Sequence, residues 1–286
     1  MKRAAPLIKE LPPQTLIRAY LWRVGWPSKL ALIGLILLTL VAAVPSFFSP
    51  FDPQVPVSTA FLPPSATHWF GTDDIGRDLF SRVALGVHYT WLPGLGVILV
   101  SLATGATIGL IAGSAGGVLD FALQRVTDLF LVMPTTLLAL AVAAALGPGI
   151  WNVAIALLLA WWPWYAIIAR DEVRRIRVRP HFQAAMASQA SPARLVLKYS
   201  LPGVVPSLIV AAALDVSNVI MAFALMSFLG LGEPEPAPEL GALTARSLDS
   251  LTAFWWLPLM PAAVVFLICL LANLAGDGLR AALEGR

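Results

Sequence analysis

Charged residues are scarce in this sequence: Asp, Glu, Lys and Arg together make up only 12% of its 286 residues. Soluble globular domains carry about 25% charged residues, which cover the surface that faces water. Hydrophobic residues account for 58% of the chain. The shortage of charge excludes an ordinary soluble domain and predicts an integral membrane protein.

Cysteine is almost absent, since Cys269 is the only one in the chain. An intrachain disulfide is therefore excluded, and Cys269, which lies within an apolar run, is expected to be a small packing residue. The sequence also lacks the short apolar core of a cleaved signal peptide near its start, because the first apolar run begins only near Leu30. We expect that run to form the first membrane span.

Motifs of common enzyme classes are missing as well. The sequence contains no nucleotide-binding loop of the form G-x-x-x-x-G-K-[ST], no H-E-x-x-H zinc motif and no G-x-S-x-G nucleophile motif. Its three histidines, His68, His88 and His181, are expected in different loops and lack the spacing of metal ligands. We therefore expect this chain to have no catalytic residue, no metal site and no cofactor of its own.

Long apolar runs are what the sequence has instead. A membrane-spanning helix needs about 20 mostly apolar residues. Six segments meet this requirement and predict an all-α membrane protein with six transmembrane helices: Pro27–Phe48, Trp91–Gly116, Leu129–Leu146, Ile150–Ala169, Val204–Gly230 and Phe254–Ala275. Only three residues, Gly147-Pro148-Gly149, separate the third segment from the fourth, so these two are expected to form a hairpin.

The chain is predicted to form one transmembrane domain, residues 27–286, after a cytoplasmic segment, residues 1–26. Within that segment, Thr15–Trp26 mixes apolar residues with Arg18 and Arg23, which is typical of an amphipathic helix on the inner membrane surface. The longer connections are expected in an outer loop, a cytoplasmic loop and a second outer loop, at residues 49–90, 170–202 and 231–253.

The distribution of basic residues predicts the orientation, because Lys and Arg favour the cytoplasmic side of short loops. If the N-terminus is inside, 16 of the 19 Lys and Arg residues fall on the cytoplasmic side, and only Arg77, Arg82 and Arg246 fall outside. We therefore expect a multi-pass protein of the cell (inner) membrane with both termini in the cytoplasm.

Tryptophans cluster near two expected membrane interfaces. Trp161, Trp162 and Trp164 lie toward the inner end of the fourth predicted span, and Trp255 and Trp256 lie at the outer end of the sixth. An interfacial anchor is the expected role, because the indole ring is apolar and its N–H can reach water. Lining a pathway is the alternative.

Asp215 is the only acidic residue within a predicted span, and Asn218 shares its helix face. A charge at this depth is costly and faces either a cavity or a polar partner. Two interpretations remain open. The two residues either line a translocation path, or they belong to a hydrogen-bonded contact between helices, in which Asp215 can also be protonated.

Four glycines at a spacing of four follow one face of the second predicted span: Gly105, Gly109, Gly113 and Gly117. Such a stripe allows another helix to approach closely, so helix packing is the expected role. A sliding surface for gating is the alternative.

The segment HWFGTDDIGRDLFSR, from His68 to Arg82, falls in the first outer loop. Thr72 or Asp73 is expected to cap a short helix there, and Asp78 and Arg82 have the spacing of an ion pair across one helical turn. The acidic residues indicate a cation site only weakly.

The segment HFQAAMASQASPARLVLKYSLPG, from His181 to Gly203, contrasts with the apolar runs around it. It predicts two short helices with a sharp joint, the second beginning with Ser191 as N-cap and Pro192 at the first position and ending at Leu201-Pro202. Small alanines on the first helix suit entry into a groove of another protein. An amphipathic surface loop is the alternative.

This insert resembles the cytoplasmic loop of permease subunits of bacterial ABC importers, through Gln183-Ala184-Ala185, Gln189 and Tyr199-Ser200-Leu201-Pro202. Four further motifs, in order along the chain, are similar to the C-type permease of dipeptide, oligopeptide and nickel importers: FGTDDIGRD, ALGPGIWNV, SFLGLG and NLAGDGLRAAL. The resemblance covers nearly the whole chain and implies the MetI-like permease fold.

The resemblance implies that two related permeases form the path, that two ATP-binding subunits lie below them, and that an external substrate-binding protein docks outside. ATP and magnesium would then be bound by the partner subunits. The insert would be the coupling helix that contacts an ATPase, through Phe182, Gln183, Ala184, Ala185, Gln189, Ser191 and Pro202. Peptides are the expected substrate, with nickel or a metal chelate as the alternative.

Two positions depart from the family pattern. Gln183 replaces an acidic residue, and Gln189 replaces a glycine whose place at a helix end favours positive φ. Either the joint has a different shape, with Ser191-Pro192 setting the turn, or its cost is absorbed. A different class of function, a stand-alone secondary transporter or channel, would normally show inverted repeats and several intramembrane charges.

Overall fold

The computed structural model describes residues 25–284, and this part of the chain is helical without a β-strand. The predicted interfacial helix at Thr15–Trp26 lies almost entirely outside the described residues. The helices are α2 (Trp26–Ala43), α3 (Pro45–Phe48), α4 (Leu79–Ala115), α5 (Gly117–Leu131), α6 (Thr135–Leu146), α7 (Ile150–Arg177), α8 (Pro180–Ala187), α9 (Pro192–Arg194), the π-helix η1 (Leu195–Ser200), α10 (Leu201–Phe228), α11 (Leu240–Arg246), the 3₁₀-helix η2 (Leu248–Ser250) and α12 (Trp256–Glu284).

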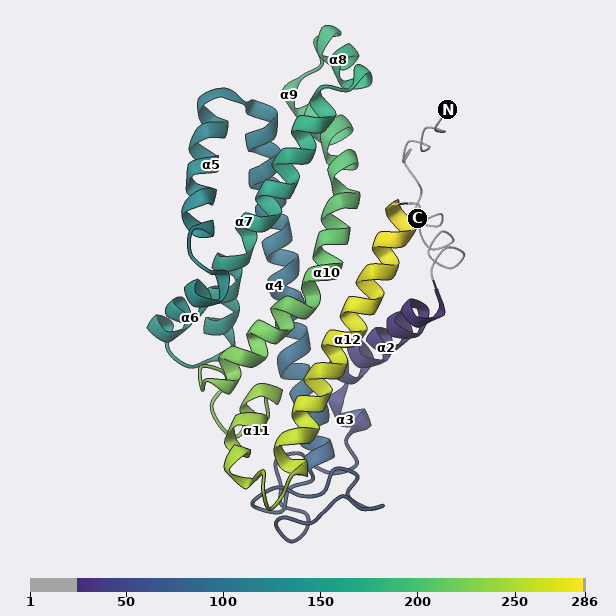
Figure 1. The fold of residues 1–286 in the computed structure, drawn as a ribbon, viewed down its shortest axis with the longest axis vertical. Helices are drawn as coiled ribbons and strands as arrows, with labels where there is room; N and C mark the ends of the chain where they lie inside the picture. Colours follow the sequence, from purple (N-terminus) through teal and green to yellow (C-terminus); the bar gives the residue numbers. More distant parts are fainter. Residues whose placement is uncertain (1–24, 285–286) are drawn as a thin grey trace.

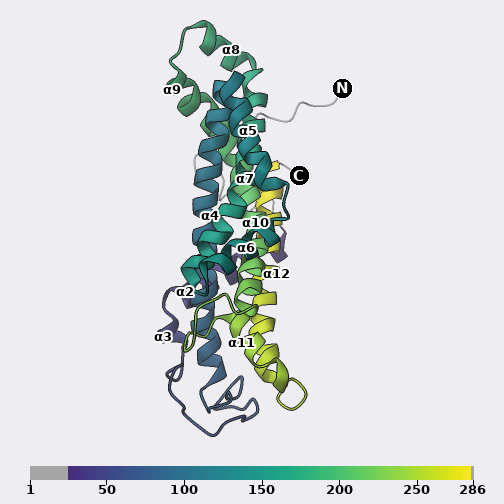
Figure 2. The same cartoon turned by 90° about the vertical axis from the view of Figure 1, so that its left-hand side faces the viewer.

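The helices form an elongated bundle, with α8 and α9 at one end and the 49–78 connection and α11 at the other (Figures 1 and 2). Five helices are long and apolar enough to cross a membrane, and a bent pair, α5 and α6, makes a sixth crossing if it counts as one span. The prediction of six apolar segments in an all-α chain is therefore confirmed in outline.

The third predicted span, Leu129–Leu146, is not one straight helix. The chain bends by 81° between α5 and α6. The reason is Pro134, whose ring disfavours the helical conformation of the residue before it, so that α5 ends at Leu131. The length of apolar runs did not predict α5, because polar residues interrupt its apolar residues.

α4 begins at Leu79, twelve residues before the predicted start at Trp91, and contains 37 residues. The Asp78 side chain caps it by accepting a hydrogen bond from the amide of Ser81, at 2.8 Å. The first outer loop therefore ends at residue 78. His88, expected in a loop, lies on α4, and its Nδ1 is 2.6 Å from the carbonyl oxygen of Ala42 in α2.

The predicted cytoplasmic loop is also shorter than residues 170–202. α7 continues to Arg177, and no break occurs at Leu201-Pro202, because η1 passes directly into α10. Pro202 has no N–H to donate, and the π-helix accommodates this: the amide of Leu201 bonds to the carbonyl of Val196, five residues back.

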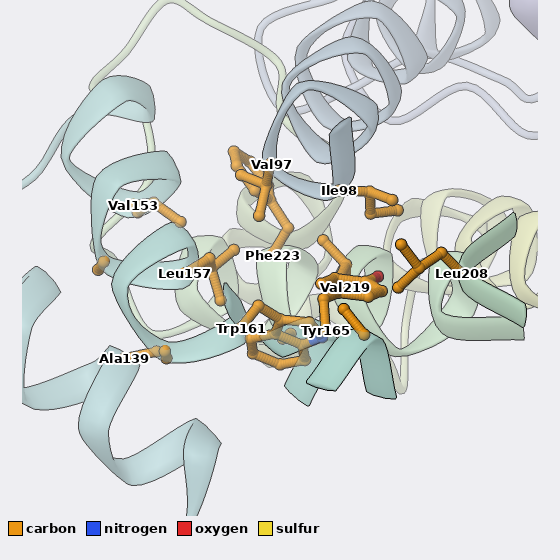
Figure 3. Close-up of a cluster of buried hydrophobic side chains, with 14 of the residues drawn as sticks. Val97, Ile98, Ala139, Val153, Leu157, Trp161, Tyr165, Leu208, Val219 and Phe223 are labelled. Carbon is orange, nitrogen blue, oxygen red and sulfur yellow. The ribbon is translucent and has the colours of Figure 1, made fainter. Parts of the chain in front are cut away.

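The main core joins α4, α6, α7 and α10, as Figure 3 shows for Val97, Leu157, Tyr165 and Phe223 among others. Trp161 belongs to this core, and Trp162 is equally buried. The interfacial-anchor prediction is wrong for these two residues, because α7 extends well beyond them and they lie near its middle. Trp164 is exposed, and Cys269 is buried as a packing residue.

α4 and α7 pack against each other through three of the predicted glycines. A Cβ atom at Gly105, Gly109 or Gly113 would lie within 3.0 Å of atoms of residues 162–173 on α7. Gly117 does not share this contact, because a Cβ there would face open space. Its φ of +58° instead serves the turn between α4 and α5.

Candidate functional site

The α8 segment combines a buried face with an exposed one. Phe182 is 2% exposed and packs edge-to-face against Tyr199 of η1, with ring centroids 6.4 Å apart. Ala185 is buried beside it, whereas Gln183 and Ala184 are exposed. Only Ala184 of the two predicted alanines can therefore contact another protein without a change in this chain.

The joint after α8 keeps the shape that glycine would favour. Gln189 has a φ of +56°. Its amide bonds to the carbonyl of Met186 at 2.9 Å, and the amide of Ala190 bonds to the carbonyl of Ala185 at 3.1 Å. These are the two hydrogen bonds of a Schellman motif, in which the left-handed residue is usually glycine. Gln189 thus adopts the left-handed conformation despite its conformational cost, and the joint does not take a different shape.

The start of the second short helix agrees with its prediction. The Ser191 hydroxyl accepts from the amide of Arg194 at 3.4 Å, and Pro192 takes the first helical position. α8 and α9, whose N-cap is Ser191, lie at the protruding end of the molecule (Figure 2). Pro202 is separated from them by η1 and lies at the start of α10, where it is exposed.

Apolar side chains are exposed on this protruding end, which we call the α8 tip (residues 178–198). They belong to Val178, Met186 and Leu197. Basic side chains, including Arg179 and Arg194, are exposed among them. An apolar surface with a basic surround is suited to contact with a protein cleft.

Polar contacts tie the tip to the bundle. The Gln183 side chain donates from Nε2 to the carbonyl of Arg177 at 2.7 Å, and Arg177 donates from its own side chain to the carbonyl of Gly113 at 2.9 Å. Asp120 of α5 accepts from Arg170 and Arg174 of α7, each at a closest distance of 2.5 Å. The tip is therefore continuous with α7, α4 and α5.

Asp215 takes part in a contact between helices. The hydroxyl of Tyr165 on α7 donates to its Oδ2 at 3.1 Å, and the side-chain Nδ2 of Asn218 donates to its Oδ1 at 3.0 Å. Asp215 is buried, whereas Asn218 is exposed. The geometry favours the interhelical interpretation for Asp215 and leaves only Asn218 on an open surface.

The predicted first outer loop contains the buried charged residues Asp73, Arg77 and Asp78. Neither Thr72 nor Asp73 caps a helix, and the expected Asp78–Arg82 ion pair does not form. Asp78 instead accepts from Ser81 and lies 2.9 Å from Nδ1 of His68, while the carboxylate nearest to Arg82 is Asp73, at 3.5 Å. No cluster of three or more metal-binding side chains occurs among residues 25–284, so the structure gives no support to the cation site.

Glu239, at the N-terminus of α11, is a buried carboxyl that the sequence does not single out. Burial raises its pKa above the ordinary value, while hydrogen bonds from Ser227 and from the amide of Glu233 act in the opposite direction. A carboxylate oxygen of Glu233 accepts from the amide of Ile150 at 3.0 Å, which joins this loop to the α6–α7 turn. The sequence predicted only an outer loop around Glu239, at residues 231–253.

Tyr165 and Asp120 were missed for a related reason. Each has its polar partner 50 residues away in the sequence, on another helix. No local spacing signals such a pair. The sequence offers one indication for Asp120. It lies close to the end of a glycine-rich apolar span, where a basic partner on a neighbouring helix is favourable.

Residues 105–286 match the family described as binding-protein-dependent transport system inner membrane component. The probable D,D-dipeptide transport system permease protein DdpC of Escherichia coli K12 is 36% identical over 251 residues, 87% of this chain and 84% of that protein. The nickel transport system permease protein NikC of the same strain is 37% identical over 259 residues, 89% and 92% of the two chains.

Among solved structures, the inward-facing MetNI methionine ABC transporter is similar over 66% of this chain and 93% of that chain. The TM-score is 0.49 and the sequence identity is 20%.

Proposed function

This chain belongs to the family of binding-protein-dependent transport system inner membrane components, and from that premise we propose that it forms half of the path of an ABC importer for di- and oligopeptides. Relatives named as dipeptide and oligopeptide permeases support the substrate class, at 36% and 32% identity. A relative named as a nickel permease makes nickel or a metal chelate the second candidate.

The observation that carries the proposal is the α8 tip. Its exposed apolar and basic side chains project beyond the bundle, and hydrogen bonds join it to α7 and α4. A force applied at the tip would therefore reach the helices that pack around the core. We propose that Phe182, Gln183, Ala184, Ala185, Gln189, Ser191 and Pro202 position this coupling element against an ATPase subunit.

The remaining parts of the proposal concern partners. A second permease, two ATP-binding subunits and an external binding protein would complete the importer. ATP and magnesium would be bound by the ATPase subunits, since the sequence of this chain contains no nucleotide-binding loop. This chain would then have no catalytic role. Asn218, exposed on α10, is the proposed path-lining residue.

The coupling role is tested by substitution on the exposed face of α8. Ala184→Arg should abolish co-purification of the ATPase subunit, because a long charged side chain would block a close fit. Ala253→Arg, at an exposed alanine near the start of α12, is the matched control. Retention of the ATPase by Ala184→Arg, with normal stimulation of ATP hydrolysis, would contradict the coupling assignment.

The substrate class is tested by uptake. Cells that lack this chain should lose uptake of labelled dipeptides or pentapeptides and should recover it when the chain is restored. Radioactive nickel uptake should stay unchanged. Loss of nickel uptake with peptide uptake intact would replace the peptide assignment with the second candidate.

A further inference from the structure

A cavity of about 140 Å³ lies at the end of the molecule opposite α8. Its walls come from the outer loop, the start of α4, α11 and the start of α12, with Leu257 among the apolar lining residues. Three arginines are among its lining residues, Arg77, Arg82 and Arg246. These are the only basic residues that the positive-inside pattern leaves outside, so membrane orientation does not explain them.

Arg82 is the residue that requires an explanation, because it is only 1% exposed. Its Nε has no hydrogen-bond acceptor within the described part of the chain, and its Nη1 donates to the carbonyl of Pro53 at a long 3.3 Å. A buried cation without a hydrogen-bonded anion is costly, so the unsatisfied Nε needs a structural or functional explanation.

The nearest acid meets this need only in part, through an ion pair without a hydrogen bond. Asp73 lies 3.5 Å from Nε of Arg82, but its oxygens already accept from Nε of Arg77 at 2.6 Å, from the Arg77 amide at 2.8 Å and from the Ile75 amide at 3.1 Å. Asp78, the acid nearest to Arg82 in the sequence, is engaged by His68 and Ser81. The buried wall of the cavity thus holds Arg77, Arg82 and one carboxylate, whose three hydrogen bonds come from Ile75 and Arg77 and none from Arg82.

The remaining acids lie at the rim. Asp74 lies 3.8 Å from Arg77, and Glu235 lies 3.2 Å from Arg246, but the two acidic side chains are 68% and 64% exposed, so water and salt screen these ion pairs. The cavity is therefore positive in its buried part and negative at its mouth. Guanidinium groups match the planar geometry of carboxylates and bind them with two parallel hydrogen bonds.

We propose that this cavity binds a carboxylate group, held by Arg82 with Arg77 and Arg246 beside it. Two sources carry this chemistry: the C-terminal carboxylate of a transported peptide, and an acidic side chain of the external binding protein. The choice of these sources rests on the proposed function, whereas the carboxylate site itself rests on the buried arginine.

The test uses the full chain in lipid nanodiscs and three probes: sodium acetate, the dipeptide Ala-Ala, and its C-terminal amide. Binding is measured by titration at constant ionic strength set with sodium chloride. The free acid should bind at least about tenfold more tightly than the amide, because the amide loses a charge-assisted contact. Acetate should compete with the free acid.

Two variants locate the site. Arg82→Gln should weaken binding of the free acid about tenfold, while Arg125→Gln, at an exposed arginine on α5, should leave it unchanged. Because Arg82→Gln can also disturb folding, Ser250→Phe provides a second variant that fills the cavity from its lining and keeps every arginine. It should remove binding as well.

The outcomes separate the two sources. Tighter binding of Ala-Ala than of acetate supports the peptide terminus, and equal binding supports a protein side chain. Equal binding of acid and amide, or normal binding by Ser250→Phe, would overturn the site. Peptide uptake with no carboxylate binding refutes only this inference, whereas carboxylate binding without peptide uptake refutes only the proposed peptide function.

Discussion

At the scale of single residues, Gln189 shows how a departure from a sequence pattern can leave the structure intact. Its backbone takes a φ of +56°, which costs a residue with a Cβ about 1–2 kcal/mol relative to glycine. The two Schellman hydrogen bonds of Gln189 and Ala190 hold it there. The joint was predicted to have either a new shape or an absorbed cost, and the structure selects the second.

Gln189→Gly should stabilise the end of α8 for this reason. We expect amide hydrogen exchange in residues 180–191 to slow about fivefold, which corresponds to about 1 kcal/mol. Ala184→Gly is the matched control, because glycine inside a helix costs about 1 kcal/mol and should speed exchange. The strain argument fails if both glycine variants speed exchange equally.

At the scale of elements, the contact between α4 and α7 depends on glycine at particular turns. A Cβ at Gly109 would lie 2.3 Å from the carbonyl oxygen of Ala166, whereas a Cβ at Gly96 on the same helix would have no neighbour within 4 Å. Backbone atoms cannot move aside as a flexible side chain can. The stripe is therefore a packing surface along one part of α4 and not along the whole helix.

Gly109→Ala should lower the melting temperature of the purified chain, because the two helices must separate, at a cost of about 1–3 kcal/mol. Gly96→Ala should raise stability by up to about 1 kcal/mol, since alanine favours a helix and meets no neighbour here. Thermal unfolding in one detergent compares the two. Equal melting temperatures would show that α7 moves away without cost.

At the scale of the whole molecule, the arrangement places the basic α8 tip and the buried-charge loop at opposite ends (Figure 1). The bias of basic residues predicts that the tip is cytoplasmic and that residues 49–78 are outside. Since Cys269 is the only native cysteine and is buried, added cysteines can be labelled against a low background.

Ala60→Cys should therefore react with a membrane-impermeant maleimide in intact cells, and Ala187→Cys should react only after the cells are opened. Both alanines are exposed in this chain, and because Ala187 lies on the proposed ATPase contact, the comparison uses cells that lack the ATPase subunits. Labelling of the unmodified chain measures the background. The reverse pattern would place both termini outside.

The sequence alone determined much of this protein. Apolar run length predicted six segments, Ser191-Pro192 predicted the start of a helix, and ordered motifs indicated the family. These features are local, because each depends on residues that are neighbours along the chain. The same method placed the start of α4 twelve residues late and made α5 and α6 one straight span, since polar helical turns do not register as apolar runs.

Only the tertiary structure decided which of these residues meet. It paired Asp215 with Tyr165, placed Ala185 inside and Ala184 outside, and left Arg82 buried beside a carboxylate that Arg77 already occupies. The physical reason is that burial and hydrogen bonding depend on contacts between distant segments. The predicted outer loop is an example. The spacing of Asp78 and Arg82 predicted an ion pair, but in the structure Asp78 contacts His68 and Ser81 instead.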